Sequence, residues 1–327
     1  MNPIIASLMG GNFFLKGELM KKYDVIIIGA GPAGMTAALN CLRAGKSVLL
    51  LEGESIGGQI ALSPRVENFP TVQKAAGADL CDQLFQQITE WGVEFEFESA
   101  IGVEKKEKSF VVKTDYSEYE GTALILATGV KARHIGVDRE EELVGKGVSY
   151  CALCDGMFYK GEDVAVIGDA NTALQYALNL SGYCKSVHIC MLFDKFFADK
   201  ALVDLVLAQP NVKVTKNIAL KEFLGDDELT GLRFENTVTK EEFRVDCKCA
   251  FVCIGQVPNN KAFEGLVQLD KNGFIIADEN CTTSCEGVFV AGDCRTKKIR
   301  QFITAAGDGS IAAFFASQYV DKVNSLN

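Results

Sequence analysis

The stretch YDVIIIGAGPAGMTAALNCLRAGKSVLLLE, residues 23–52, decides the fold. Its first apolar run predicts a buried β-strand over 23–28, and apolar residues at helical spacing after the glycine turn predict a helix that ends near Ala44. A second apolar run predicts another strand that ends at Glu52. Strand, helix and strand form one complete βαβ unit, so we expect an α/β protein with a doubly wound parallel sheet.

The turn inside this unit carries the pattern GxGxxG. Gly29 makes the tight turn, Gly31 lets the backbone approach a pyrophosphate, and Gly34 permits close packing of the helix. Glu52 stands where an acidic residue accepts a hydrogen bond from a ribose hydroxyl. Anions are favoured at a helix N-terminus by free N–H groups and by the helix dipole. The sequence therefore predicts a dinucleotide site here.

The stretch 162–190, EDVAVIGDANTALQYALNLSGYCKSVHIC, repeats the pattern, with strands expected over 164–168 and 186–190. Two further strands, expected over 124–129 and 250–255, resemble crossovers between two such halves. A last strand near 292 and a long apolar helix follow, and we expect them to return to the first half. The predicted organisation is an N-terminal extension (1–19), a discontinuous nucleotide-binding domain (20–130 and 258–327) and an inserted central domain (131–257). Met20 is an alternative start.

Composition narrows the classes of partner. The chain has 48% hydrophobic residues, 23% charged residues and a net charge of −10, which opposes general nucleic-acid binding. No apolar run is long enough to span a bilayer, and residues 1–19 lack the basic start of a secretory signal. The 12 cysteines are scattered in a chain too large to need disulfide staples, so we expect a reducing, cytoplasmic location.

The stretch YCALCDG, residues 150–156, places Cys151 and Cys154 two residues apart, with Asp155 directly after them. A structural zinc site needs four ligands, but the chain offers one CxxC and two isolated histidines, His134 and His188. The remaining candidates are Cys247, Cys249 and Cys253 on an expected buried strand, and Cys281 with Cys285. A redox disulfide fits better, because CxxC thiols close and open a small ring reversibly. Asp155 is either its proton carrier or only a helix cap.

The motifs GAGPAG, GGQI, VENFP, LATG, CALCD, AGD and RQFITAAGDG occur in this order between Tyr23 and the C-terminus. In order and spacing the sequence resembles the low-molecular-weight thioredoxin reductases, which are homodimeric FAD flavoproteins. The resemblance implies that Cys154 faces the flavin, that Cys151 attacks the disulfide of thioredoxin and that Asp155 serves as acid and base. It assigns FAD to Gly29, Gly31, Pro32, Ala33 and Gly34 (pyrophosphate), Glu52 (ribose), Gly58, Gln59 and Asn68 (along the cofactor), Asp293 (ribityl chain), and Arg300 and Gln301 (flavin ring). Gly129 and Gly255 are the hinges expected for a swivelling central domain.

The second glycine turn departs from that family, which binds NADPH there through GxGxxA and a basic HRRxxxR stretch. The turn reads GDANTA, so Ala170 takes the place of the second glycine and Asp169 adds a carboxylate. Both changes oppose a pyrophosphate. After His188, we expect Ile189 and Cys190 to replace the two arginines.

The rest of that second region also lacks the expected cations. Asp194 and Asp199 add negative charge, and Lys195 alone is a poor substitute for arginine. Phe193, Phe196 and Phe197 are expected in the core.

These losses resemble a subgroup of thioredoxin-reductase-like flavoenzymes that is reduced by ferredoxin, so reduced ferredoxin is the expected donor. An acidic ferredoxin would need a local basic patch, for which RTKKIR (295–300) is the candidate. Three alternatives remain: a divergent NADPH or NADH site that still works, a ferredoxin–NADP reductase, whose relatives lack the CxxC, and a flavin redox sensor without turnover. A peroxiredoxin reductase would need an extra N-terminal domain.

Overall fold

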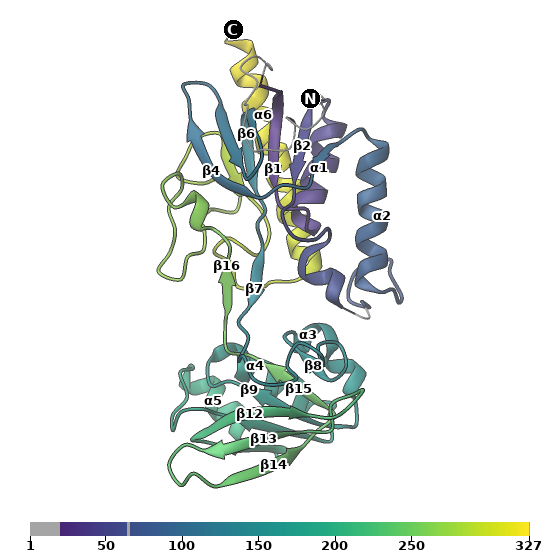
Figure 1. Cartoon of the computed structure of the whole chain (residues 1–327), viewed down its shortest axis with the longest axis vertical. Coiled ribbons are helices and arrows are strands. Elements are labelled where there is room, and N and C mark those ends of the chain that lie inside the picture. Colours follow the sequence, from purple (N-terminus) through teal and green to yellow (C-terminus); the bar gives the residue numbers. More distant parts are fainter. Residues whose placement is uncertain (1–19, 64–65, 327) are drawn as a thin grey trace, which may run out of the picture.

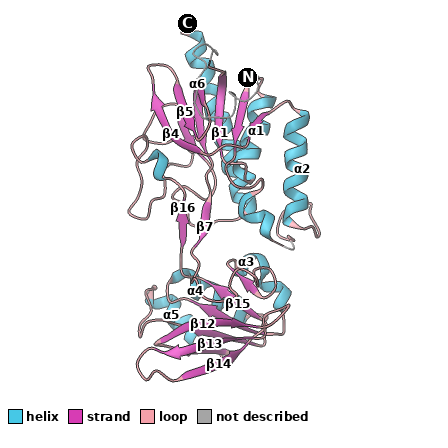
Figure 2. Ribbon diagram, viewed as in Figure 1, coloured by secondary structure: helices cyan, strands magenta, loops and turns pink. Residues whose placement is uncertain are grey.

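The computed structural model describes residues 20–63 and 66–326, so the N-terminal extension and Asn327 lie outside the described residues. The chain forms two bodies, one above the other, joined by a narrow two-stranded link (Figure 1). Each body has a sheet with helices on one face (Figure 2). No described helix is long and apolar enough to cross a membrane.

The first body is built on a seven-stranded sheet of order β3-β2-β1-β6-β5-β4, with β17 paired to β6. β1, β2, β3, β6 and β17 run parallel, and the meander β4–β5–β6 is antiparallel. The strands are β1 (Lys22–Ile28), β2 (Val48–Leu51), β3 (Glu94–Glu96), β4 (Ala100–Lys105), β5 (Phe110–Thr114), β6 (Glu118–Leu126) and β17 (Val288–Val290). β17 comes from the C-terminal part of the chain, which confirms that this segment returns to complete the first sheet.

Both faces of this sheet are buried, and for that reason β1 is apolar at nearly every position. Val25 and Ile27 face the helices α1 (Pro32–Arg43), α2 (Gly77–Glu90) and α6 (Phe302–Ser325). Ile26 and Ile28 face the opposite core, which the β4–β5 hairpin and the 263–294 segment complete. The alternation follows from the two-residue period of a strand.

The second body has a parallel five-stranded sheet of order β11-β10-β9-β15-β8. Its strands are β8 (Val148–Ser149), β9 (Asp163–Ile167), β10 (Ser186–Cys190), β11 (Val212–Thr215) and β15 (Cys249–Val252). Helices α4 (Asn171–Ser181) and α5 (Lys200–Leu207) pack on one face, and the antiparallel strands β12 (Ile218–Leu224), β13 (Gly231–Asn236) and β14 (Glu242–Asp246) cover the other. The predicted α/β class with two doubly wound units is confirmed.

The link consists of β7 (Val130–Ala132) and β16 (Gln256–Pro258), which pair antiparallel. Each strand follows a glycine with positive φ, Gly129 at 63° and Gly255 at 108°. The shorter elements are α3 (Ala152–Asp155), η1 (Gly58–Leu62), η2 (Gly156–Tyr159) and η3 (Lys261–Phe263). With α3 on the upper face of the second body, the CxxC motif is turned toward the first body (Figure 1).

Candidate active site

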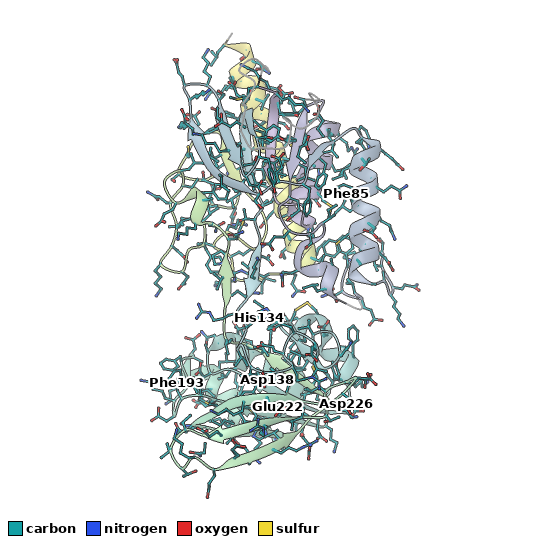
Figure 3. All side chains as sticks on the ribbon, viewed as in Figure 1. Phe85, His134, Asp138, Phe193, Glu222 and Asp226 are labelled. Atoms are coloured by element: carbon teal, nitrogen blue, oxygen red, sulfur yellow. A yellow bond between two sulfur atoms is a disulfide. The ribbon has the colours of Figure 1, made fainter. Side chains whose placement is uncertain are left out.

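Cys151 and Cys154 form a disulfide, with their Cα atoms 5.3 Å apart. It is the yellow bond at the junction of the two bodies in Figure 3. Cys151 is the N-cap of α3, and its carbonyl accepts hydrogen bonds from the N–H groups of Cys154 (3.2 Å) and Asp155 (3.0 Å). The other ten cysteines are free and buried, so among the described residues this pair alone carries a disulfide.

Asp155 lies beside the disulfide and is tied to it through Ser149. The Ser149 hydroxyl donates to Asp155 Oδ2 at 2.7 Å and accepts the N–H of Cys151 at 3.1 Å. Burial raises the pKa of Asp155, and hydrogen bonds from Ser149 and Ser63 oppose that rise. Ser63 directly follows η1 in the first body, so this carboxyl group stands at the junction between the bodies. Asp155 is the last residue of α3 and the N-cap position of η2, but its side chain makes no capping hydrogen bond there.

The first glycine turn has the geometry of a phosphate cradle. Gly29 has a φ of 109°, and a Cβ there would lie 2.3 Å from the Ala127 carbonyl oxygen. A Cβ on Gly34 would lie 1.8 Å from the Gly29 carbonyl oxygen. At Gly31, by contrast, no described heavy atom lies within 4 Å of the Cβ position. Gly29 and Gly34 are therefore required by the protein's own packing, while the space beside Gly31 is open to a ligand.

The other predicted residues of this site gather around the turn. Glu52 accepts the N–H of Ala30 at 2.8 Å, and a Cβ on Gly58 would lie 3.7 Å from the Cα of Gly31. Pro32 and Ala33 begin α1, and Gly292 packs against Ala33. Gln59 is exposed in η1, one residue beyond Gly58. The predicted residues Gly29 and Glu52 thus directly follow the carboxyl ends of the parallel strands β1 and β2, and Gly58 lies next to the turn at Gly31.

Asn68 and Gln301 meet across a long sequence separation. The Asn68 side-chain amide donates to Gln301 Oε1 at 2.9 Å, and the neighbouring rings of Phe69 and Phe302 stack at 4.4 Å. Gln301 is also the N-cap of α6, where it forms a capping box with Thr304. Two residues that the sequence placed in one site are therefore in direct contact.

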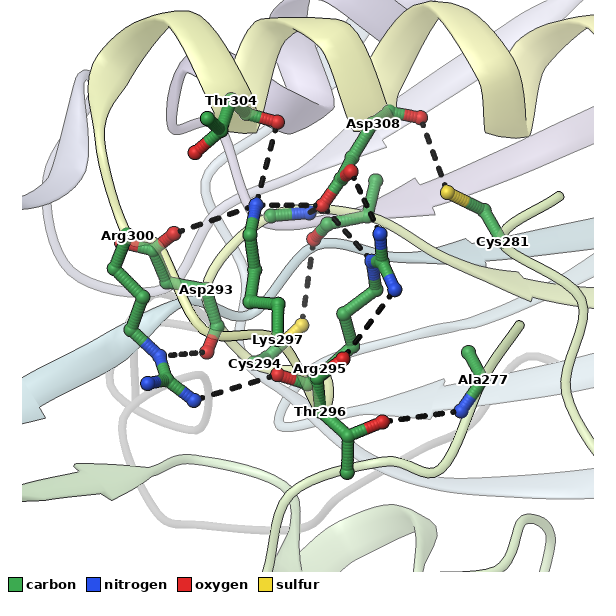
Figure 4. Close-up of polar contacts among 12 residues, drawn as sticks. Ala277, Cys281, Asp293, Cys294, Arg295, Thr296, Lys297, Arg300, Thr304 and Asp308 are labelled. Carbon is green, nitrogen blue, oxygen red and sulfur yellow. Dashed lines mark hydrogen bonds and ion pairs between the residues drawn. The ribbon is translucent and has the colours of Figure 1, made fainter. Parts of the chain in front are cut away.

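Asp293 follows β17 and has a buried oxygen, Oδ1, that makes no hydrogen bond to any described residue. Burial raises its pKa to about 6, and the charges of Lys297 and Arg300 oppose part of that rise. Arg300 donates from Nε to the Asp293 carbonyl oxygen at 3.2 Å (Figure 4), and its guanidinium lies 4.3 Å from the Phe274 ring centroid. Asp293 Oδ1 lies 4.0 Å from Lys297 Nζ, and a buried oxygen that has this ion pair but no hydrogen bond is a position that a bound hydroxyl group would satisfy.

The prediction of an exposed basic patch at RTKKIR (295–300) is wrong. Arg295 and Lys297 are 13% and 9% exposed, and both bind the carboxylate of Asp308 on α6, at 2.9 and 2.8 Å (Figure 4). Lys298 is exposed, but Arg300 is held by backbone carbonyls. Most of the positive charge in this stretch is neutralised inside the first body, so it does not form a surface for an acidic partner.

The second glycine turn repeats the first in backbone geometry and differs in side chains. Gly168 has a φ of 151°, and a Cβ there would lie 2.5 Å from the Cys253 carbonyl oxygen. Ala170 is the N-cap of α4, in the same extended conformation as Gly31, the N-cap of α1. Its methyl group therefore stands where the first turn is open. Burial also raises the pKa of the neighbouring Asp169.

A chain segment that we call the strap, residues 191–199, lies across this second turn. The N–H of Phe197 donates to the Asp169 carbonyl oxygen at 2.8 Å, and Ala170 and Phe197 form a parallel β-bridge. Asn171 and Asp199 exchange two hydrogen bonds, at 2.9 and 3.3 Å. The strap is thus bonded to the residues that begin α4, where a dinucleotide would place its phosphates, although Ala170 and Asn171 are only partly buried and Thr172 is exposed.

Two expectations for this region are corrected. Ile189 and Cys190 belong to β10 and are buried, so they are not loop positions from which arginines would grip a phosphate; the loop begins at Met191. Phe193 and Phe197 are half exposed, at 50% and 52%, and pack edge to face on the strap, whereas Phe196 is partly buried. The aromatic residues therefore form much of the strap's surface and only partly join the core.

Comparison with known proteins identifies the family to which the chain belongs. A family model described as pyridine nucleotide-disulphide oxidoreductase matches residues 23–309. The chain belongs to this family. Among its relatives, a thioredoxin reductase from Peptoclostridium acidaminophilum is 39% identical over 306 residues, covering 91% of this chain and 97% of the relative.

Two solved structures bear on the site. Thioredoxin reductase from Streptococcus pyogenes MGAS5005 has a TM-score of 0.89 at 33% identity and covers 93% of this chain and 100% of its own. A ferredoxin-flavin thioredoxin reductase from Clostridium acetobutylicum has a TM-score of 0.53 at 29% identity and covers 94% of this chain and 100% of its own. Both match along nearly the whole chain.

Sequence reasoning missed Ser149 and the strap. A serine two residues before a CxxC is a usable signal, because such a side chain reaches the backbone of the first turn. The strap carries no signal of its own, since its contacts join residues 169–171 to 197–199.

Proposed function

We propose that this protein is a thioredoxin-disulfide reductase that carries electrons from reduced ferredoxin, through FAD and the Cys151–Cys154 disulfide, to thioredoxin. The observation that carries the choice of donor is the second glycine turn itself, where Ala170 replaces the second glycine and the strap is bonded to residues 169–171. The named relatives support the class of reaction.

FAD is proposed for the first body. The open space beside Gly31, the N-terminus of α1 and the acidic Glu52 suit the diphosphate and ribose of a dinucleotide. Asp293 Oδ1, which is buried and makes no hydrogen bond to the described residues, suits a ribityl hydroxyl. When bound, the flavin accepts electrons singly and passes them on as a pair. Arg300, held against Asp293 and Phe274, would line the ring.

The disulfide performs the exchange with thioredoxin. Two electrons and two protons convert it to two thiols. The thiolate of Cys151 then attacks the thioredoxin disulfide, and Cys154 attacks Cys151 to restore the ring and release reduced thioredoxin. Asp155, tied to the motif by Ser149, exchanges the protons. Because each ferredoxin carries one electron, two are consumed per thioredoxin.

The second cradle argues against a phosphorylated hydride carrier. Ala170 fills the position of closest backbone approach, Asp169 adds a carboxylate, and the strap is bonded across both. No arginine stands between residues 191 and 199 to bind a 2′-phosphate. A ferredoxin-flavin thioredoxin reductase is among the solved structures that the chain resembles, so this electron donor occurs among proteins of similar fold.

The remaining assignments are proposals too. Residues 20–130 and 258–327 would form the FAD domain and 131–257 the redox domain, supported by the strand memberships of the two sheets. The central domain would swivel at Gly129 and Gly255, whose positive φ suits a hinge. A homodimer is carried over from the resemblance, and a cytoplasmic location from the scattered cysteines of the sequence.

Anaerobic titration of the purified holoenzyme tests the donor. Reduced ferredoxin should bleach the flavin absorbance, and NADPH or NADH should leave it oxidised, while dithionite confirms that the flavin is reducible. Rapid bleaching by NADPH would refute the ferredoxin route. Steady turnover with thioredoxin is expected; reduction of only one equivalent would favour a redox sensor instead.

A further inference from the structure

Ser149 occupies a position between the redox disulfide and Asp155 that neither the motif nor the proposed reaction assigns. It is 6% exposed and lies at the end of β8, paired with Phe251 of β15. Its backbone is therefore held by the central sheet and not by the short helix α3. A hydroxyl fixed by a sheet keeps its place when the disulfide at α3 opens and closes.

The Ser149 hydroxyl donates its hydrogen to Asp155 and accepts one from the backbone of Cys151. A hydroxyl has one hydrogen to donate. Asp155 Oδ2 lies 2.7 Å away and the Cys151 carbonyl oxygen 3.5 Å away, so the hydrogen points to the carboxylate. The oxygen in turn accepts the N–H of Cys151 at 3.1 Å. The two hydrogen bonds, from Cys151 N–H to Ser149 and from Ser149 to Asp155, therefore point in one direction and strengthen each other toward the carboxyl group.

This pattern makes the two carboxylate oxygens unequal. Oδ2 is anchored, whereas Oδ1 is buried and makes no hydrogen bond to any described residue. An anchored oxygen is a poor proton acceptor because it already shares a hydrogen. The unanchored oxygen is the one left to gain and lose a proton.

We propose that Ser149 is a positioning residue that fixes Asp155 so that Oδ1 exchanges the proton of the CxxC thiols. When the Cys154 thiol attacks Cys151 in the mixed disulfide, its proton passes to Oδ1. The Cys154–Cys151 bond forms, the bond to thioredoxin breaks, and the proton goes to the departing thiolate. This role rests on the proposed function of the disulfide and does not depend on the electron donor.

Apart from the two thiols of the reduced CxxC pair, the neighbouring titratable groups leave Asp155 as the group that changes charge. Tyr159, Tyr176 and Cys249 respond to its charge, and burial raises the pKa of each, so all three stay protonated at neutral pH. Besides Ser149, the hydroxyl of Ser63 also lowers the pKa of Asp155. Loss of Ser149 therefore raises that pKa further.

The pH dependence of thiol reactivity tests the role without ferredoxin or thioredoxin. The holoenzyme is reduced with dithiothreitol, and the iodoacetamide rates of Cys151 and Cys154 are followed by mass spectrometry across pH. In the plot of alkylation rate against pH, the transition that reports the ionisation of Asp155 should move to a pH about one unit higher in Ser149→Ala. Ser149→Thr, which keeps the hydroxyl, should restore it. In an Asp155→Asn background, Ser149→Ala should cause no further shift.

Ser186→Ala is the matched control. Ser186 donates to Asp163 at 2.6 Å in the same body and has no contact with the disulfide, so its removal should leave the profile unchanged. If Ser149→Ala does not fold, Ser149→Gly, which also removes the hydroxyl and adds no thiol beside the CxxC pair, should give a shift in the same direction. An unchanged profile in the folded Ser149 variants overturns the proposal. Failure of the wild type to reduce thioredoxin would instead overturn the proposed function.

Discussion

Arg295 and Asp308 form an ion pair at 2.9 Å beneath α6, and Lys297 reaches the same carboxylate at 2.8 Å. Burial alone would raise the pKa of Asp308, but the hydrogen bonds from Arg295 and Lys297 outweigh it and hold the pKa below its usual value. The cluster fixes the segment that leads from Asp293 to α6, and so links the stability of the first body to its candidate flavin site.

Asp308→Ala should destabilise the protein by about 3–5 kcal/mol, because it leaves two cations buried without their partner. Glu286→Ala, which removes an exposed ion pair with Lys322, should change stability by less than about 1 kcal/mol. Urea unfolding of both variants measures the contrast. Similar losses in the two would mean that the buried cluster is not structurally important.

The same carboxylate predicts an acid limit. Since the folded-state pKa of Asp308 is depressed, its stabilisation is complete above its unfolded value of about 4 and is lost as pH falls through the folded value. The free energy of unfolding of the wild type should therefore decline below pH 4, and the decline should be smaller in Asp308→Asn, which lacks this carboxyl group. A parallel decline in both proteins would contradict this origin.

Gly31→Ala should abolish tight FAD binding while leaving the fold intact. The Cβ would enter the open space beside the turn, where we place the pyrophosphate, and affinity should fall at least about tenfold. Gly102→Ala, which also adds a methyl group in open space but on β4, is the control and should bind FAD normally. The FAD affinity of each variant is measured by removing the flavin and titrating FAD back while following its fluorescence.

Restoring the glycines of the second turn should not restore nicotinamide binding. In Asp169→Gly/Ala170→Gly the strap is still bonded to the backbone of residue 169 through the Phe197 N–H. Calorimetry with NADPH should show no tight binding. Binding by this double variant would mean that the turn residues alone, and not the strap, exclude the cofactor.

Asp293→Asn should have opposite effects on the protein with and without flavin. Because burial raises the pKa of Asp293 from its usual value near 4 to about 6, the flavin-free fold loses stability as pH rises from about 4 to about 6, and the loss is complete above pH 6. The amide removes this cost, so the flavin-free variant should be more stable by about 2 kcal/mol at pH 7 and no more stable at pH 4. Thermal melts at both pH values test this, and FAD affinity should fall.

Cys151→Ser and Cys154→Ser should each abolish thioredoxin reduction, since either change removes the disulfide that carries the electron pair. Both variants should keep FAD, because the cysteines lie in the second body. Turnover retained by either variant would count against the disulfide as the route.

Local pattern determined much of this protein. The βαβ units, the two glycine turns and the CxxC pair depend on residues close together in the chain, and periodicity with glycine conformation predicts them. The strand expected over 186–190 has those bounds in the structure, and the C-terminal strand joins the first sheet as expected.

The tertiary structure decided what distant residues do to one another. RTKKIR reads as a surface patch because its partner, Asp308, lies on another element; only folding turns Arg295 and Lys297 inward. Ile189 and Cys190 were expected where the two arginines of the family would stand, but both are buried in β10 between β9 and β11, and the loop begins only at Met191. The strap and the Ser149–Asp155 bond likewise arise from long-range packing. Such contacts have no sequence period, and therefore only the assembled fold shows that the strap is bonded to the second glycine turn and that the space beside Gly31 in the first turn is open.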